Sequence, residues 1–268
     1  MLSKGQLKKF HDKGYLKFNV LNKKFLNQLR QEFLLKFKKL RLNKKNFQKK
    51  YHKILIDLKE HHKVQSEFQK IIFKKKIHYN LIKFYKSYFA QILGQDIAAT
   101  TSVNFRAVRP KKNIDNIGFH RDTDLGHTPY EINVWVPLFD TNKSNSLYIL
   151  PKSHQKKLDY FKFTKMKTKF IRGGNENKLG YFYKSFKFKN LNHKKMIPIV
   201  CKFGQIIIFY SSCIHGTKTN TSNETRFSFD FNISNSFFPI KWFHHGNETK
   251  YEKILFSNIS KNAKKIKI

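Results

Sequence analysis

Cysteine and long apolar runs are both scarce in this 268-residue chain. Only two cysteines occur, Cys201 and Cys213, and they form no Cys-x-x-Cys pair, which argues against a disulfide scaffold and a cysteine-based zinc site. No apolar stretch is long enough to span a bilayer, and the N-terminal residues lack the continuous apolar segment of a secretory signal. We therefore expect a cytoplasmic protein with reduced thiols and no membrane span.

Acidic residues are few as well, since 17 Asp and Glu stand against 55 Lys and Arg, for a net charge of +38. A charge of this size attracts phosphate polyanions, so a basic nucleic-acid-binding protein is one alternative function. The lysines are spread over nearly every segment, however, and they accompany abundant Phe and Asn with only 11 Gly and 6 Pro, as in proteins from AT-rich genomes. We therefore expect nonspecific attraction to polyanions and no specific nucleic-acid partner.

The first third of the chain has the spacing of amphipathic helices. Ser3 is a suitable cap for a helix that ends before Gly14, and the YLKF sequence after it predicts a strand. A second helix is expected to open at Asn22, with apolar residues at intervals of three and four, and a third helical region covers about 60–92. The lysine-rich stretch 36–53 is expected to be a solvated face or a flexible basic turn.

From about residue 97 onward, short alternating runs broken by Pro, Asn, Gly and Asp predict a β-sandwich or barrel. Three runs are especially clear: QIIIFY as a buried strand, and EINVWVPL and TRFSFDFNIS as strands with one apolar and one polar face. We expect the apolar faces to pack on the helices and the polar faces to line a cavity. The apolar residues are Ile132, Val134, Val136, Leu138, Phe227, Phe229, Phe231 and Ile233, and the polar-face residues are Glu131, Asn133, Trp135, Arg226, Ser228, Asp230 and Asn232.

Three residues are candidate metal ligands. His120 and Asp122 are two positions apart, so they share one face if IGFHRD is extended, and His215 follows the QIIIFY strand. Two imidazoles and one carboxylate form the facial triad of non-haem iron oxygenases, which leaves three positions at Fe(II) for a cosubstrate and dioxygen. A His-x-Asp sequence also arises by chance in surface loops, which is the alternative reading.

Arg226 lies eleven positions after His215 (226 − 215 = 11), on the polar face of a predicted strand. A fixed guanidinium can bind a carboxylate through two hydrogen bonds, as a dicarboxylate such as 2-oxoglutarate requires. The keto-acid end would chelate the iron, the far carboxylate would meet Arg226, and the hydroxyl of Thr217 would be a second donor. The alternative is an exposed strand arginine, because the same alternation fits a half-exposed sheet.

The chain resembles the phytanoyl-CoA dioxygenase family of Fe(II)- and 2-oxoglutarate-dependent oxygenases. The resemblance runs through GFHRDTD, NVWVPLFDTNKSNSLYILPKSH and GQIIIFYSSCIHGTKTNTSNETRFSFDF, with LSKGQLKKFHDKGYLKF near the start, and covers roughly 2–40 and 100–235. The EINVWVPLFD block is similar to a subgroup found among sugar and aminoglycoside biosynthesis proteins. The chain has SNSLYILPKSH where the family usually has an Asn-Gly pair and a Gly-Ser-His ending.

This resemblance implies a mainly β fold with flanking helices, namely a double-stranded β-helix of the jelly-roll or cupin type with N-terminal helices packed on the sheet. It also implies that His120, Asp122 and His215 are the catalytic iron ligands and that Arg226 and Thr217 hold 2-oxoglutarate. We expect one oxygenase domain over 1–268. Its expected parts are a helical front (1–95), a β-helix core (96–235) with an insertion at about 155–195 that forms a lid, and a C-terminal extension (236–268).

Other residues near the predicted site have weaker assignments. Trp135 is expected to wall the cosubstrate and Asn133 to hydrogen-bond it or the substrate, although a buried Trp or Asn often only fills space and satisfies neighbours. His127 is a candidate substrate contact, or simply a solvated loop histidine. His154 is expected to stabilise a turn, and Cys213 to be a small buried residue near the metal.

The function predicted from these features is hydroxylation of an unactivated C–H bond in a small metabolite or a sugar-containing precursor, with 2-oxoglutarate and O2 consumed and succinate and CO2 released. Related halogenases lack the carboxylate ligand, so Asp122 favours hydroxylation, desaturation or epimerisation. Lipid acyl substrates are a competing class. A non-catalytic metal-binding β-sandwich of the same fold is the other alternative.

Overall fold

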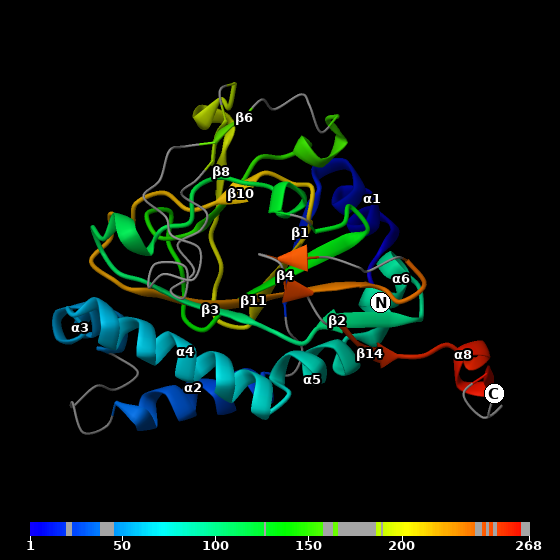
Figure 1. Cartoon of the computed structure of the whole chain (residues 1–268), viewed down its shortest axis with the longest axis horizontal. Helices are drawn as coiled ribbons and strands as arrows, with labels where there is room; N and C mark the ends of the chain where they lie inside the picture. The colour runs from blue at the N-terminus through cyan, green and yellow to red at the C-terminus, as the bar shows by residue number, and fades with distance from the viewer. Residues whose placement is uncertain are drawn as a thin grey trace.

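The computed structural model describes residues 1–19, 23–37, 46–125, 127–157, 163–165, 186–188, 190–238, 243–244, 247–248 and 251–263. Several helices lie along one side of a large antiparallel sheet, and a smaller sheet lies on the other side (Figure 1). The helices are α1 (Lys4–Lys13), α2 (Lys24–Lys36), α3 (Phe47–Ile54), α4 (Leu58–Lys74), α5 (Ile77–Phe84), α6 (Lys86–Leu93) and α8 (Asn258–Ala263).

The start of the chain folds as its sequence predicts. The hydroxyl of Ser3 accepts a hydrogen bond from the backbone N–H of Gln6, whose side chain in turn accepts from the Ser3 N–H, so a capping box begins α1. The helix ends at Gly14, which has a left-handed φ of 85°. Strand β1 (Tyr15–Asn19) follows directly, which confirms the predicted helix and strand.

The predicted third helical region is three helices. A left-handed residue, Lys76 with φ 50°, separates α4 from α5, and Tyr85 separates α5 from α6. The breaks let each short helix turn its own apolar stripe to the sheet. The basic turn predicted at 36–53 is wrong for its second half, because Phe47 and Tyr51 are buried on α3. Residues 38–45 and the predicted helix start at Asn22 lie outside the described residues.

The large sheet has the order β1-β9-β4-β11-β2-β14, and β3 also pairs with β11. The small sheet has the order β10-β5-β8, and two further strand pairs are β6 with β7 and β12 with β13. The large-sheet strands after β1 are β2 (Ile97–Thr100), β3 (Asn104–Val108), β4 (Glu131–Pro137), β9 (Gln205–Tyr210), β11 (Arg226–Asn235) and β14 (Tyr251–Leu255). The other strands are β5 (Leu147–Ile149), β6 (Phe163–Lys165), β7 (Phe186–Phe188), β8 (Ile197–Ile199), β10 (His215–Gly216), β12 (Phe243–His244) and β13 (Asn247–Glu248).

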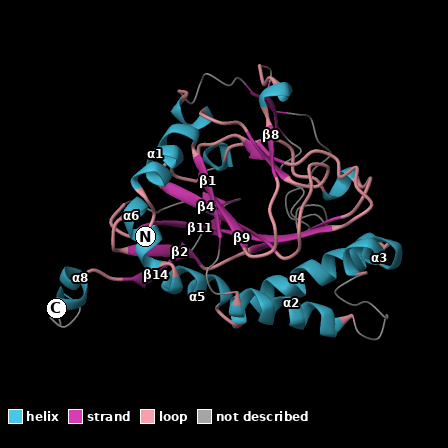
Figure 2. Cartoon of the chain, turned by 180° about the vertical axis from the view of Figure 1, so that it is seen from behind, coloured by secondary structure: helices cyan, strands magenta, loops and turns pink. Residues whose placement is uncertain are grey.

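The main core lies between the helices and the large sheet (Figure 2). The aliphatic side chains of β4 and the aromatic side chains of β11 are buried there, as their alternation predicts. Phe33 of α2 joins the two layers, because its ring centroid lies 4.7 Å from that of Phe47 and 4.9 Å from that of Phe227. The polar faces of β4 and β11 therefore point away from the helices, toward the small sheet.

One predicted region lies largely outside this description. Most of the predicted lid at 155–195 falls on residues that the structure does not describe, namely 158–162, 166–185 and 189. The lid therefore stays a prediction. Among the described residues, no helix combines the length and the apolar composition needed to cross a membrane.

Candidate metal and carboxylate site

Backbone pairing brings the three candidate metal ligands together. His120 forms an isolated antiparallel bridge with His215, through two N–H to C=O hydrogen bonds of 2.9 Å. Asp122 begins a short 3₁₀ helix, η3 (Asp122–Leu125), and its backbone N–H donates to the carbonyl of Ser211 at 2.9 Å. The prediction of an extended strand through Asp122 is therefore wrong, because this bond to Ser211 turns the chain inward directly after His120.

The side chains nevertheless converge. One ligand atom from each of His120, Asp122 and His215 lies within 4.8 Å of the others, and all three residues are buried. The Nε2 atoms of both histidines lie 3.5 Å from the same oxygen, Oδ1 of Asp122. Among the described residues, no other set of three His, Cys, Asp or Glu side chains has this spacing.

The other nitrogen of each imidazole is held by the backbone. Nδ1 of His120 lies 2.8 Å from the carbonyl oxygen of Gly118, and Nδ1 of His215 lies 3.0 Å from that of Cys213. A carbonyl only accepts, so each Nδ1 carries the proton and each Nε2 presents its lone pair to the centre. This is the arrangement in which histidines bind metals, with the second nitrogen donating to an outer partner.

The charges also suit a cation. Burial alone would raise the pKa of Asp122, but His215, His120 and His127 outweigh burial and lower this pKa. Burial lowers the pKa of His215 to about 4. The carboxylate is therefore ionised and this imidazole neutral at neutral pH, which are the forms that bind a metal ion.

Two amides orient the carboxylate. Nδ2 of Asn133 on β4 and Nδ2 of Asn232 on β11 donate to Oδ2 of Asp122, at 3.3 and 3.4 Å. Oδ1 is thereby left facing the two imidazoles. These three ligand atoms fit a metal ion that the protein holds on one side only, as the residue types in the sequence predict.

A pocket of about 500 Å³ opens beside these residues. The metal-ligand residues reach it, and so does the polar face of β11 as predicted, except for Ser228, which is not in the lining. Its lining comprises Asn104, Arg106, Ile117, His120, Asp122, His127, Asn133, Trp135, Leu147, Phe209, His215, Gly216, Thr217, Arg226, Asp230 and Asn232.

Arg226 is a buried cation in the wall of this pocket, with 2% of its surface exposed. Its Nη1 donates to the carbonyl of Asn145 at 3.3 Å, and its guanidinium carbon lies 5.8 Å from the ring centroid of Trp135. Its Nε is buried and has no hydrogen-bond partner within the described part of the chain. Burial, and next Arg106, lower the pKa of Arg226 to about 9, so it is still charged at neutral pH. A buried charge with an unused donor suits an anionic ligand.

Thr217 and Asn133 have partners that sequence reasoning did not foresee. The hydroxyl of Thr217 donates to the carbonyl of Ile117 at 3.0 Å and accepts from the Ile117 N–H at 3.1 Å. The Thr217 hydroxyl would have to break its hydrogen bond to the Ile117 carbonyl before it could donate to a cosubstrate. Asn133 supports Asp122 through Nδ2, while its Oδ1 has no partner among the described residues and stays available as an acceptor.

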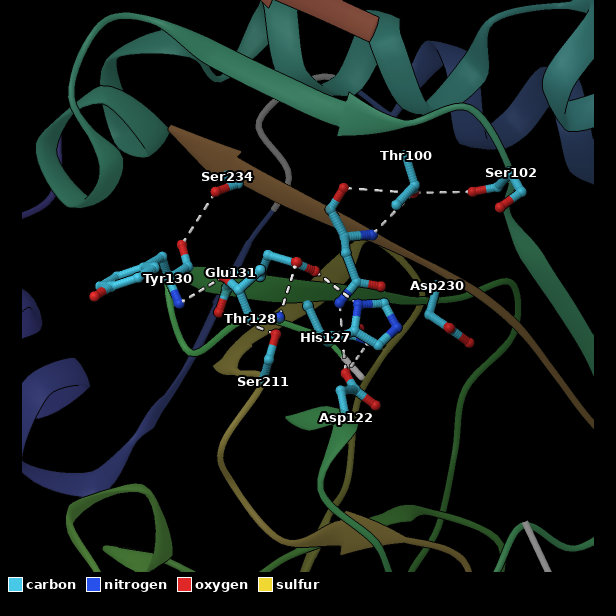
Figure 3. A network of polar contacts seen from close by, with 12 residues as sticks. Thr100, Ser102, Asp122, His127, Thr128, Tyr130, Glu131, Ser211, Asp230 and Ser234 are labelled. Carbon is cyan, nitrogen blue, oxygen red and sulfur yellow. Dashed lines mark hydrogen bonds and ion pairs between the residues drawn. The ribbon is translucent and has the colours of Figure 1, made fainter. Parts of the chain in front are cut away.

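His127 and Glu131 form a second polar group near the site (Figure 3). Nδ1 of His127 lies 2.7 Å from Oε2 of Glu131. Burial disfavours the charged imidazole, but the hydrogen bond to Glu131 and the charge of Asp122 raise the pKa of His127. The prediction that Glu131 lines the cavity is wrong. Glu131 is fully buried and is not part of the pocket lining, whereas its hydrogen-bond partner His127 is.

The two weaker predictions for structural residues agree with the geometry. Nε2 of His154 lies 2.8 Å from the carbonyl of His11, and its ring stacks on Tyr210, so His154 ties the loop after β5 to α1. Cys213 is buried, its thiol donates to the carbonyl of Gly14 at 3.2 Å, and burial raises its pKa to about 12. Cys213 is therefore a protonated thiol that fills space in the core behind the site.

Comparison with known proteins gives one family and one fold. The family model described as Phytanoyl-CoA dioxygenase (PhyH) matches residues 10–228. No curated protein matches the sequence. The chain is similar to EvdO2 from Micromonospora carbonacea var. aurantiaca complexed with 2-oxoglutarate, at 10% identity and a TM-score of 0.57 over 94% of this chain and 93% of that one.

Two further solved structures are similar. The non-heme monooxygenase ThoJ has 14% identity and a TM-score of 0.55, over 94% of this chain and 84% of that one. The epimerase SnoN, in complex with Fe3+, alpha ketoglutarate and nogalamycin RO, has 10% identity and a TM-score of 0.50, over 87% of this chain and 83% of that one. Identities this low establish the fold alone. Together with the family match, they confirm the predicted jelly-roll class with helices on the sheet.

Proposed function

Because the chain belongs to the phytanoyl-CoA dioxygenase family, we propose that it is an Fe(II)- and 2-oxoglutarate-dependent oxygenase that hydroxylates a C–H bond of a small metabolite or a sugar-containing precursor. The observation that carries the proposal is the position of His120, Asp122 and His215. Their three ligand atoms meet in a buried site, with both outer Nδ1 atoms held by backbone carbonyls. Three protein donors beside a pocket leave coordination positions open for other ligands, as in catalytic metal sites.

Each part of the site has a distinct task. Nε2 of His120, Nε2 of His215 and Oδ1 of Asp122 would hold the ferrous ion, and the two asparagine amides on Oδ2 keep the carboxylate turned toward it. When bound together, iron, 2-oxoglutarate and O2 supply the oxidising chemistry, with succinate and CO2 as coproducts. The protein supplies the position of each reactant and a site with little water.

Arg226 is assigned to the far carboxylate of 2-oxoglutarate. It comes from the first residue of β11, while Asn232, six residues further along the same strand, touches Asp122. The alternation places both side chains on one face. The guanidinium carbon of Arg226 lies 5.8 Å from the ring centroid of Trp135, which is two residues along β4 from Asn133, the other amide that contacts Asp122. Two residues of strand span about 7 Å, so a short dicarboxylate bound at the metal ligands would reach toward Arg226 along this polar face. The far carboxylate of 2-oxoglutarate would accept a hydrogen bond from Nε of Arg226, which has no partner among the described residues.

The intact carboxylate ligand bears on the reaction type. Asp122 occupies the position where related halogenases leave room for chloride. Its presence argues against halogenation and is compatible with hydroxylation, desaturation or epimerisation, of which we propose hydroxylation. We also propose that the substrate is a small molecule and not a specific nucleic acid.

The test is turnover of 2-oxoglutarate by the purified protein with Fe(II) and O2, followed as succinate formation. Asp122→Ala removes one ligand and both amide contacts, so we expect succinate formation to fall to the background of protein without iron. Asp140→Ala is the matched control, because Asp140 is an exposed carboxylate paired with Lys202 at 3.2 Å. Undiminished succinate formation by the Asp122 variant would refute the assignment.

A further inference from the structure

A second carboxylate reaches the same pocket and has no part in holding iron or 2-oxoglutarate. Asp230 lies on β11 between Arg226 and Asn232, on the polar face, and lines the pocket. It is 8% exposed. Figure 3 shows it on the side of His127 away from Glu131, on a different element from Asp122.

Strand β3 supplies the partners of Asp230. Nδ2 of Asn104 donates to Oδ2 of Asp230 at 3.0 Å, and Nε of Arg106 lies 3.5 Å from Oδ1. Both side chains also line the pocket. Strand pairing fixes this group, because Asp230 is the register partner of Asn104, and Ser228 is that of Arg106.

A buried carboxylate in this place is unfavourable by itself. Burial raises the pKa of Asp230, against the opposing effects of Arg106 and Asn104. The ionised carboxylate of Asp230 also repels the two negative charges of any 2-oxoglutarate in the same pocket. An ionised carboxylate has about four acceptor sites, and these two contacts with described residues leave acceptor capacity on its pocket side. A ligand with hydrogen-bond donors would use that capacity.

The neighbouring lining is polar too. The donors of Asn104 and Arg106 lie beside the acceptor Asp230, and the ring of His127 lines the same pocket. Hydroxyl groups both donate and accept, so a compound with neighbouring hydroxyls can satisfy such a mixed surface. An alkyl chain would displace water from a charged pair and return no hydrogen bond, which is costly.

We infer that Asp230, Asn104 and Arg106 form a substrate subsite that binds neighbouring hydroxyl groups of a neutral, hydroxyl-rich compound, such as a sugar or a cyclic polyol. This inference rests on the proposed function. Asp230 accepts from the hydroxyls, while Asn104 and Arg106 donate to their oxygens. The three residues select and position the substrate, and they do not take part in the oxidation.

The first experiment measures which compounds stimulate succinate formation by the full-length protein loaded with Fe(II). The panel contains neutral sugars, cyclic polyols, amino acids and palmitoyl-coenzyme A. We expect stimulation by a hydroxyl-rich neutral compound. Stimulation by palmitoyl-coenzyme A alone, or by no hydroxylated compound in protein that still consumes 2-oxoglutarate, would overturn the inference.

The second experiment uses the best stimulant and its deoxy analogues, each lacking one hydroxyl. We expect Asp230→Asn to raise KM by about tenfold or more, as for loss of a hydrogen bond to a charged group. One deoxy analogue should show a similar penalty with the unchanged protein and almost none with Asp230→Asn, because the two changes remove the same contact. Asp140→Asn, an exposed carboxylate with its own lysine partner, is the matched control.

These outcomes separate a binding role from a structural one. If Asp230 only ties β3 to β11, its replacement lowers stability, and every deoxy analogue is penalised equally in variant and unchanged protein. That result would overturn the inference. Failure of the proposed function is distinct, since the unchanged protein would then form no succinate from 2-oxoglutarate under any condition.

Discussion

Replacing Arg226 by methionine is predicted to change ligand affinity and stability in opposite directions. Within the described part of the chain, the guanidinium makes one hydrogen bond of 3.3 Å, and its buried Nε has no partner. Burial, and next Arg106, lower its pKa from the ordinary value of an arginine to about 9. This corresponds to roughly 5 kcal/mol against the buried charge when no anion is bound.

The expected magnitudes follow from this geometry. Methionine fills similar space without a charge, so the protein without 2-oxoglutarate should be as stable as the unchanged one or more stable, by about 1–4 kcal/mol at most. Affinity for 2-oxoglutarate should fall by about 30-fold or more, because losing one partner of a buried charge pair costs about 2 kcal/mol or more. Urea unfolding gives the first quantity, and titration of the Fe(II)-loaded protein with 2-oxoglutarate gives the second.

Arg109 is the matched control, because it is equally buried and fully paired. Its Nε and Nη2 donate to the two oxygens of Asp115 at 2.8 and 2.9 Å, and its Nη1 donates to the carbonyls of Leu55 and Ile56. Arg109→Met should therefore lower the free energy of unfolding by about 3–5 kcal/mol, as expected when a buried partner is stranded. It should leave 2-oxoglutarate affinity unchanged. The reasoning is refuted if Arg226→Met destabilises the protein as Arg109→Met does and binds 2-oxoglutarate normally.

Two further predictions concern the core and the small sheet. Burial lowers the pKa of His78 to about 4, so the folded protein keeps this histidine neutral while the unfolded chain takes up a proton below about pH 6.5. The neutral His78 therefore contributes its full stabilisation above pH 6.5, and this stabilisation is lost as the pH falls toward 4, by about 2 kcal/mol at pH 5. Urea unfolding from pH 8 to 5 should show this loss in the free energy of unfolding, and His78→Leu should reduce it. An identical pH profile for the variant would contradict the prediction. Gly216→Ala should abolish tight Fe(II) binding, because the added Cβ would lie 2.7 Å from the carbonyl oxygen of Gly118 and push β10 away from the His120 segment. Unchanged iron affinity in that variant would show that the bridge between His120 and His215 tolerates such a shift.

Local sequence predicted much of this fold. The capping box at Ser3, the left-handed Gly14 and the strand after it depend on residues within a few positions of one another. The two faces of β4 and β11 also follow from local sequence, because apolar and polar residues alternate along each strand. These features were accessible without knowledge of the partner strands.

The features that sequence reasoning missed depend on residues distant in the chain. Asn104 and Arg106 reach the pocket because β3 pairs with β11, more than a hundred residues later. Asp122 enters a 3₁₀ turn because its N–H meets the carbonyl of Ser211. Glu131 lies behind His127, which no alternation pattern could reveal. The candidate ligands were identified by residue type and order, while their supporting contacts required the structure.

The central claim is that His120, Asp122 and His215 hold one ferrous ion that 2-oxoglutarate then chelates. Anaerobic titration of Fe(II) into the protein with 2-oxoglutarate, followed by the visible metal-to-ligand absorption band, tests it most directly. We predict saturation at one iron per chain, loss of the band in His215→Ala, and its retention in His154→Ala, whose imidazole bonds the carbonyl of His11 away from the site. Absence of the band in the unchanged protein, or a band of full intensity in His215→Ala, would contradict the claim.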